Sequence, residues 1–580
     1  MLSVKSIIKT IIFSAILIFA GTQFIFAQNS TQISGIVVDQ NGDVIPSVQI
    51  TILSNGGTLE RTVVSDTEGF FSFPFLPADE YSLKILKDGF DPAEVANLTI
   101  AEGNSRQFKI ELKINSLSET IKVESEPVET NEKVANSTVF DQTAIERFPF
   151  NGRNHQSMIN LVPGVVFTPV DNKNLGQFSV NGQRTNANYF TVDGISANFG
   201  TTNYDFLGQT GSGSIPSRNI QGGLDNLVST EDLQEVKIET LDFSPSSGRM
   251  PGANISFITR SGNDKFSFSA FENFRSDRFN AKDYFDLEKP PHVFNNFGGS
   301  FGGPLFFTKD DRNAKNQTYF FLTFEGKSFT LPQPTIFTEV PSLDVRKNPE
   351  NRVAEAIYNS FPLPTEKDEK PPSLIPQTAT ISESTLNTYF PKTEYFRATY
   401  SDPNSSENYS LRLDHIINSK FSLFGRFNYS PSFSENRNPA NLSSFVKGKQ
   451  ITRTLTFGST QTFSSNLINE FRFNLSNQTA STNHDFDGKF GGILPDKSIF
   501  IPKSFEENKT HFRFTLNGYA DSLNFFYGNF AENEMRQLNI ADNLSYSISN
   551  HQLKFGFDYR RLLPNLKVSG YGINYDFNSA

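Results

Sequence analysis

The C-terminal half of the chain is dominated by the alternation of apolar and polar residues. In residues 553–560 (LKFGFDYR), leucine, phenylalanine and tyrosine occupy every second position. Residues 470–476 and 409–415 repeat the pattern. Because successive side chains of a β-strand point to opposite faces, the pattern predicts strands with one apolar and one polar face. The predicted inward set is Arg412, Asp414, Glu470, Arg472 and Asn474, and the outward set is Phe471, Phe473, Leu475, Leu553, Phe555, Phe557 and Tyr559.

The connections between these strands are of two lengths. Tight links at residues 418–420, 464–466 and 549–550 alternate with long ones at residues 341–403 and 482–510. A soluble sandwich shows the same side-chain alternation, but short turns at one end and long loops at the other are the arrangement of outer-membrane barrels. We therefore expect residues 263–580 to form an antiparallel transmembrane β-barrel.

The N-terminus carries an export signal. Lys5 and Lys9 precede an apolar run over residues 11–20, and Ala27 offers a small residue at a cleavage site, as in a signal peptide. The alternative is a transmembrane anchor, but the apolar run is short for a bilayer. We expect residues 1–27 to be removed after export.

The region between the signal and the barrel divides into three parts. Residues 31–115 contain short strands punctuated by glycine and proline, which predicts a β-sandwich. Residues 116–135 form a linker rich in Glu, Ser and Thr. Residues 136–262 are predicted to form a small α+β domain, with a short helix over residues 139–147.

Two short strands are expected within this small domain, at residues 178–180 and 189–192, joined by a polar turn. Asn181-Gly182 and Asp193-Gly194 suit tight turns, because these residue types tolerate positive φ. The fold class is therefore mainly β: a sandwich, a small α+β domain and an incomplete barrel.

Several motifs occur in a specific order along the chain. They are FPFNGRN and LVPGV from residue 148, VNGQR and YFTVDG from residue 180, LQEVKIET and SSGRMPGANISFITRSG from residue 233, and FGGSFGGPL and TYFFLTFEG from residue 297. Together they resemble TonB-dependent outer-membrane receptors. GIVVDQNG, SDTEGFFSF and EYSLKILKDGF resemble the carboxypeptidase-regulatory-like (carbohydrate-binding-like) domain, which narrows the resemblance to the Oar-like branch.

This resemblance implies a mechanism and partners. Residues 136–262 would be a plug inside the barrel, displaced when an energised TonB–ExbB–ExbD-type complex pulls on it. The other implied partners are outer-membrane lipid and an unknown, large extracellular solute, for which a carbohydrate is one candidate. The alternative function is that of an exported surface adhesin or carbohydrate-binding protein. We expect the N-terminal domains to be periplasmic.

One extended pattern in the linker stands out. It consists of Glu119, Thr120, Ile121, Lys122, Val123 and Glu124. Ile121 and Val123 would share one face of a strand. The segment resembles a TonB box, which adds a strand to the edge of a sheet in TonB, where backbone hydrogen bonds supply affinity. A last sandwich strand or a plain linker remains the alternative.

Barrel size predicts that the sequence covers about half of a barrel. The pattern contains about eleven strands, which would close at only about 22 Å at ~4.8 Å spacing and ~40° tilt. A plug of ~120 residues is roughly 35 Å across. The resemblance implies twenty-two strands, and the final residues lack the terminal aromatic of the family.

Composition and motifs give no sign of an enzyme. The net charge of −10 implies no nucleic-acid surface, and the absence of cysteine excludes thiol chemistry. The GxSxG match at residues 298–302 is embedded in strand, unlike a nucleophile elbow. We predict no catalytic residues, cofactor or metal, including at His484, Asp485 and Asp487. Arg153 and Arg184 are expected to hold the plug to the barrel through carboxylates.

Overall fold

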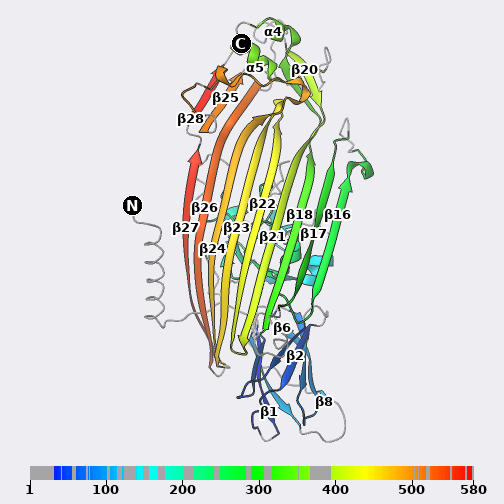
Figure 1. Cartoon of the computed structure of the whole chain (residues 1–580), viewed down its shortest axis with the longest axis vertical. Coiled ribbons are helices and arrows are strands. Elements are labelled where there is room, and N and C mark those ends of the chain that lie inside the picture. The colour runs from blue at the N-terminus through cyan, green and yellow to red at the C-terminus, as the bar shows by residue number, and fades with distance from the viewer. Residues whose placement is uncertain are drawn as a thin grey trace, which may run out of the picture.

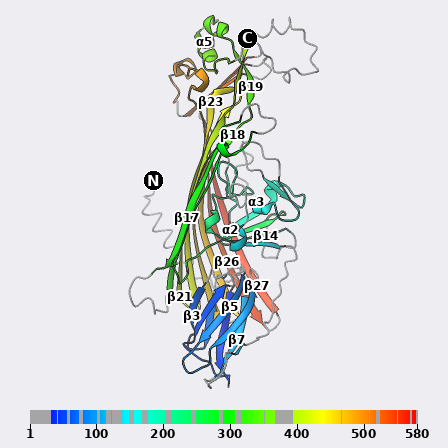
Figure 2. The same cartoon turned by 90° about the vertical axis from the view of Figure 1, so that its right-hand side faces the viewer.

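In the computed structural model of the protein, a tall curved sheet carries a β-rich domain at one end and a smaller α+β segment on its concave face (Figures 1 and 2). We call these the wall, the N-terminal domain and the plug. The structure describes residues 32–40, 42–54, 60–73, 76, 79–100, 105–113, 121–122, 137–147, 156–167, 177–201, 213–240, 249–282, 289–305, 317–349, 352–365, 393–464, 466–501, 503–506, 509–516, 523–548, 551–568 and 571–577.

The N-terminal domain consists of two facing sheets, which confirms the predicted sandwich. One has the order β4-β1-β7 and the other the order β3-β2-β5-β6-β8. An apolar core that includes Ile50, Phe71 and Leu83 lies between them. The strands are β1 (Gln32–Asp39), β2 (Gln49–Ser54), β3 (Glu60–Val64), β4 (Phe70–Phe73), β5 (Asp79–Leu86), β6 (Ala93–Ile100), β7 (Ser105–Leu112) and β8 (Ile121–Lys122).

Strand β6 does not follow the two-residue period of a regular strand, and the reason is local. Val95 and Leu98 are both buried although they lie three residues apart, which breaks the period of two. Asn97 between them has a φ of 60°, and the register with β5 shifts at the same level, between Tyr81 and Leu83. This irregularity moves the buried face from odd to even positions.

The plug contains a mixed five-stranded sheet of order β13-β12-β15-β14-β9 and a small hairpin, β10-β11. The predicted turns are confirmed, since Asn181, Gly182, Asp193 and Gly194 all have positive φ. The elements are β9 (Ser137–Asp141), α2 (Gln142–Arg147), α3 (Gln156–Ile159), β10 (Val165–Phe167), β11 (Phe178–Val180), β12 (Tyr189–Val192), β13 (Ile195–Ser196), β14 (Leu233–Glu239) and β15 (Asn254–Thr259).

Two details of the plug differ from expectation. β11 and β12 are strands, but they do not pair with each other: β11 pairs with β10, and β12 pairs with β13 and β15. The predicted helix over residues 139–147 begins only at Gln142, because residues 137–141 add a strand to the edge of β14. In both cases, pairing with distant segments overrides the local pattern.

The wall is an 11-stranded sheet of order β16-β17-β18-β21-β22-β23-β24-β26-β25-β28, with β27 also paired to β26. Its pairs are antiparallel except for β25 with β28. The strands are β16 (Ser267–Ser276), β17 (Val293–Pro304), β18 (Gln317–Pro332), β21 (Ser401–Asn418), β22 (Phe421–Asn438), β23 (Asn441–Ser464), β24 (Leu467–Phe486), β25 (Thr510–Leu516), β26 (Leu523–Ile548), β27 (His551–Val568) and β28 (Tyr571–Phe577).

The wall has a lower end, which bears the N-terminal domain, and an upper end (Figure 1). The tight links after β21, β23 and β26 lie at the lower end. The alternation of link lengths is less regular than expected. Two residues join β22 to β23 at the upper end, whereas twelve join β17 to β18 at the lower end.

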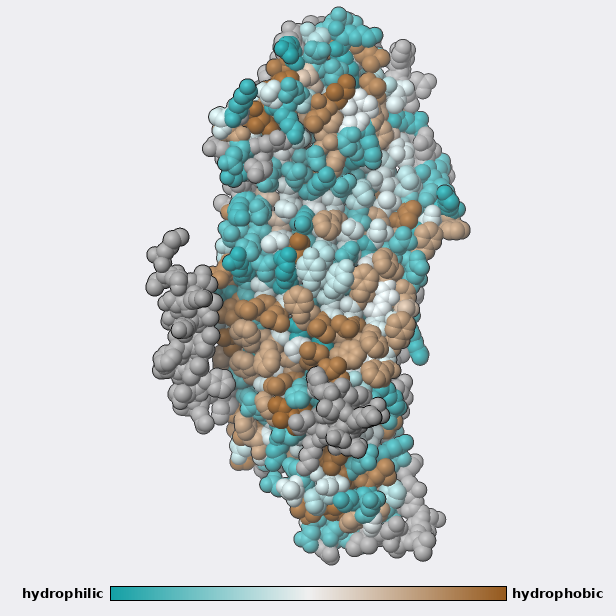
Figure 3. Space-filling view, in the orientation of Figure 1, coloured by the Kyte–Doolittle hydropathy of each residue, from teal (hydrophilic) through white to brown (hydrophobic). Residues whose placement is uncertain are grey.

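The outer face of the wall carries an apolar band. Directly paired residues on six successive strands form an unbroken row. Tyr409, Tyr429 and Arg453 form part of the next row above it, and a brown band crosses the wall at mid-height in Figure 3. A band of this kind, edged by aromatic side chains, suits contact with hydrocarbon. The row is Phe301, Leu322, Leu411, Phe427, Leu455 and Leu475.

The two long upper links pack against each other. The first contains β19 (Ile336–Pro341), α4 (Leu343–Lys347), α5 (Arg352–Asn359) and β20 (Thr393–Ala398). Its Leu363 donates a backbone hydrogen bond of 2.8 Å to Phe490 of the second. Among the described residues, no helix is long and apolar enough to cross a bilayer.

We expect Leu475→Arg to destabilise the wall in lipid by about 2–4 kcal/mol, because Leu475 lies in the apolar band. Thr479→Arg is the matched control: it lies four residues along β24 on the same face, above the Tyr409–Tyr429 row, and should cost about 0–1 kcal/mol. Urea unfolding in lipid vesicles measures both. Equal effects would show that the band does not face hydrocarbon.

Candidate functional site: the plug–wall interface

Three cations of the wall meet three carboxylates of the plug. Arg412 on β21 lies 3.3 Å from Asp193, Arg426 on β22 lies 2.6 Å from Asp232, and Lys327 on β18 lies 2.9 Å from Asp225. Each cation occupies an inward position of its strand. All six side chains are largely buried, so water screens these pairs far less than it screens surface pairs.

The Arg426–Asp232 pair is the most deeply buried, with both side chains 1% exposed. Asp232 ends the 3₁₀ helix η3 (Thr230–Asp232), which Ser229 caps by accepting a hydrogen bond from the Asp232 N–H. The Arg426 guanidinium also donates to the Leu227 carbonyl at 3.1 Å. The cap and the carbonyl bond together fix the plug loop against β22.

Arg412 is held from several sides. It makes a bidentate contact with Asp414, two residues along the same strand face, at 2.8 and 3.0 Å. It also donates to the Thr259 hydroxyl at 2.9 Å and stacks over the Phe424 ring at 4.4 Å. Asp193 is positioned by its left-handed turn, where it accepts from the Thr259 N–H and hydroxyl at 3.0 Å. This end of the plug is therefore tightly oriented.

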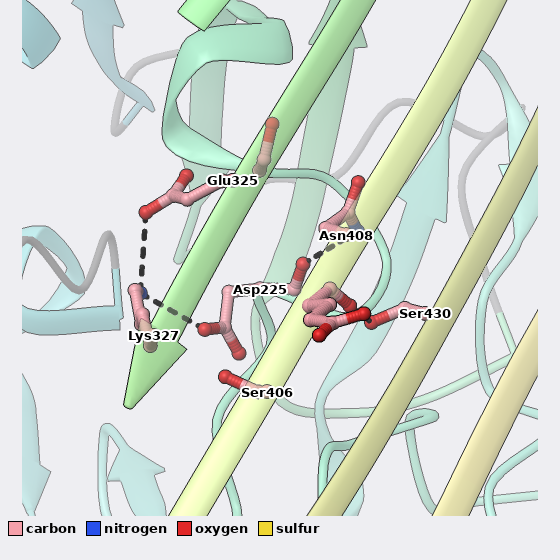
Figure 4. A pocket seen from close by; sticks show the side chains of 8 residues that line it. Asp225, Glu325, Lys327, Ser406, Asn408 and Ser430 are labelled. Atoms are coloured by element: carbon pink, nitrogen blue, oxygen red, sulfur yellow. Dashed lines mark hydrogen bonds and ion pairs between the residues drawn. The ribbon is translucent and has the colours of Figure 1, made fainter. Parts of the chain in front are cut away.

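Lys327 bridges the plug and the wall at the edge of a small cavity (Figure 4). Its ammonium group lies between Asp225 and Glu325, 3.5 Å from the latter. Glu325 in turn accepts the Thr230 N–H at 3.0 Å. One wall strand thus binds the plug segment before β14 at two points, through groups of opposite charge. The cavity is lined by Asp225, Ser229, Glu325, Lys327, Ser406, Glu407, Asn408 and Ser430.

On β23 and β24, amides and hydroxyls take the place of the ion pairs of β18, β21 and β22. Gln478 of β24 accepts the Thr201 N–H at 2.8 Å, and Gln450 of β23 donates to the Thr201 carbonyl at 3.0 Å. The Ser217 and Thr452 hydroxyls lie 3.1 Å apart. Neutral hydrogen bonds contribute less than charge-assisted ones, so these contacts of β23 and β24 are weaker than the ion pairs of β18, β21 and β22.

The plug and the wall also share an apolar core. Met535 of β26 is buried among plug residues that include Ile255 and Phe257, and Leu562 of β27 packs against the same cluster. Burial lowers the pKa of the plug residue Arg260, and the nearby carboxylates of Glu146 and Glu231 oppose this shift. The interface therefore combines desolvated charge with apolar contact.

The structure describes only part of the predicted TonB box. Ile121 and Lys122 form β8, which pairs in parallel with Ala93 and Glu94 of β6. Glu119, Thr120, Val123 and Glu124 lie outside the described residues. The two described residues thus take the position of an edge strand of the sandwich, and the TonB-box assignment stays a prediction.

Of the two plug arginines expected at this interface, the structure describes only Arg184. Arg184 is exposed at the start of η2 (Thr185–Ala187), and Arg153 lies outside the described residues. The three cations described above come instead from the wall, and the plug supplies the carboxylates. Arg249 of the plug lies 2.9 Å from Asp558 of the wall. In this pair, as expected, the plug supplies the cation and the wall supplies the carboxylate.

The weaker candidates for chemistry have structural partners. Asp485 pairs with Lys447 at 2.7 Å and Asp487 with Arg437, while the His484 ring packs against His511 at 5.4 Å. Ser300 of the GxSxG match lies within β17. Among the described residues there is no group of three or more metal-ligating side chains.

Comparisons with known proteins agree with this architecture. A family model described as "Outer membrane beta barrel domain" matches residues 258–579, which is more than half of the chain. The chain belongs to the outer membrane β-barrel domain family. A second model, "Carboxypeptidase regulatory-like domain", matches residues 32–113 of this barrel protein.

One curated relative supports the Oar-like resemblance predicted from the motifs. The barrel protein is 26% identical over 359 residues to the TonB-dependent transporter Oar of Myxococcus xanthus, covering 58% of this chain and 30% of that protein. It is 11% identical to the outer membrane transporter YddB from Escherichia coli, covering 73% of this chain and 48% of that one, with a TM-score of 0.46. It is 10% identical to FpvA of P. aeruginosa, covering 77% of this chain and 54% of that one, with a TM-score of 0.38.

We expect Asp232→Ala to loosen the plug strongly, because it leaves Arg426 buried without its carboxylate, at a cost of about 3–5 kcal/mol. Amide hydrogen exchange over residues 224–240 measures the loosening. Glu534→Ala, which breaks the exposed pair with Arg536 on the outer face, is the control and should change stability by about 0–1 kcal/mol. Unchanged exchange in Asp232→Ala would contradict the assigned role of this pair.

Proposed function

We propose that the protein is a TonB-dependent transporter that admits a large extracellular solute when its plug is displaced. The observation that carries the proposal is the plug on the concave face of an outer-membrane wall, held by contacts that can break and re-form. Energy would come from an inner-membrane complex of the TonB–ExbB–ExbD type. The alternative, an exported surface adhesin, would have no use for a plug held by contacts that break and re-form.

The polarity of the interface supports displacement of the plug. Buried ion pairs and amide bonds exchange for contacts with water when two surfaces separate, so separation costs less net free energy than the pairs suggest. A plug held mainly by apolar contact would expose hydrocarbon-like surface to water instead. The three pairs at Arg412, Arg426 and Lys327 are therefore compatible with reversible seating.

The arrangement of the ends supports an orientation. The N-terminal domain lies at the end with the tight turns (Figure 1), and outer-membrane barrels have their short turns in the periplasm. The linker that follows it would then face the inner membrane, where residues 119–124 could add a strand to TonB. The long upper links would meet the solute. A signal peptide over residues 1–27 would direct export.

A plug locked to the wall should not transport. Ser217→Cys with Thr452→Cys places two thiols where the hydroxyl oxygens are 3.1 Å apart, in a chain that has no other cysteine. Cells lacking the protein would be grown on a panel of single oligosaccharide and peptide sources. For any source on which the wild-type protein restores growth, we expect the oxidised variant not to support growth and the reduced variant to support it. Equal growth with the oxidised variant would contradict plug displacement.

The TonB box is tested separately. Ile121→Pro removes a backbone N–H and fixes φ, so we expect capture of a purified TonB C-terminal domain to fall at least tenfold if residues 119–124 add a strand to it. Thr130→Pro, six residues beyond the segment, is the control. Equal capture by the two variants would assign β8 to the sandwich alone.

A further inference from the structure

The N-terminal domain contacts the wall through a small set of polar groups. β3 lies at the edge of its sheet, where the Thr62 N–H donates to Asp264 at 3.0 Å and the Arg61 guanidinium donates to the Ser261 hydroxyl at 2.6 Å. Glu60 pairs with Lys265. Residues 261–265 form the connector between the last plug strand, β15, and the first wall strand, β16. The edge strand thus binds the junction of plug and wall.

A second contact lies at a tight turn of the wall. Lys420, in the turn between β21 and β22, lies 3.2 Å from Glu68 and 3.7 Å from Asp66. Its ammonium group is also 5.9 Å from the centre of the Phe70 ring. These groups are partly or largely exposed. Exposed pairs of this kind contribute little stability and are screened by salt.

The two docked parts of the molecule differ in how they are held. The described core of the N-terminal domain contains only residues from 33 to 112, with no wall or plug member. The core of the plug contains Met535 of the wall and packs against Leu562, and its ion pairs are buried. Arg61 is buried, but the ion pairs of the N-terminal domain with the wall are partly or largely exposed. Regions held by few buried apolar contacts open before regions that share an apolar core.

We propose that the N-terminal domain is a separately releasable brace on the connector: it undocks from the wall while the plug stays seated. While docked, the edge of β3 holds residues 261–265 against Tyr319, whose hydroxyl donates to Asp264 at 2.5 Å. Undocking frees the connector to which the plug is joined. Release of the brace therefore precedes movement of the plug, whatever agent drives that movement.

The test uses spin labels on the full-length protein in detergent micelles. Lys109→Cys with Ser464→Cys reports the distance from the N-terminal domain to the wall, and Leu161→Cys with Ser464→Cys reports the distance from the plug to the wall. All three positions are exposed, and the chain has no native cysteine. Pulsed dipolar spectroscopy would follow both pairs from about 50 mM to 1 M salt, where the screening length falls to about 3 Å.

We expect the first distance distribution to broaden with salt and the second to stay unchanged. Lys420→Glu should make the first distribution broaden at a lower salt concentration. Adding Asp66→Lys with Glu68→Lys should return the broadening to the salt concentration seen for the wild type. Lys447→Glu, which breaks an exposed wall pair remote from the N-terminal domain, should have no effect. The proposal is overturned if both distances change together, if neither changes at 1 M salt, or if Lys447→Glu acts like Lys420→Glu. None of these outcomes depends on TonB or on the solute, so the proposed transport function is tested independently.

Discussion

The structure depends on one constraint, the two-residue period of a paired strand. Once the outer face of the wall is apolar, every residue of opposite parity points to the concave side. The inward arginines and lysine cannot turn to the outer face without entering the apolar band, and a buried charge without a partner is costly. The plug supplies what they need: Asp193, Asp225 and Asp232 are placed by turns and a short helix at the levels of Arg412, Lys327 and Arg426.

This constraint explains how far the sequence can be interpreted. The faces of the strands follow from local alternation, so the outward Phe471 and Leu475 and the inward Arg412 and Glu470 were predicted correctly. The sandwich and the wall follow from repeated strands of the same kind. The motifs add the family, because their order along the chain is far more specific than any single strand.

Pairing between distant residues could not be predicted in the same way. Asp232 and Arg426 are 194 residues apart, and neither local sequence identifies the other residue as its partner. The signal that was available is weaker: Lys327 and Arg426 stand at inward positions of aromatic-rich strands, where a charge needs a partner. Arg184 was misjudged because an arginine beside a turn motif can be solvent-exposed as readily as paired. β6 could not be recognised from a two-residue period, because Asn97 shifts its buried face partway along the strand.

The lengths of the central strands set how far the molecule reaches from the membrane. β26 contains 26 residues, which at ~3.3 Å per residue makes it roughly 85 Å long. The hydrophobic band of such barrels is only ~25 Å tall, so even a strongly tilted strand spends most of its length outside it. The upper part of the wall therefore stands in water beyond the apolar band, and its long links lie far from the depth of the bilayer.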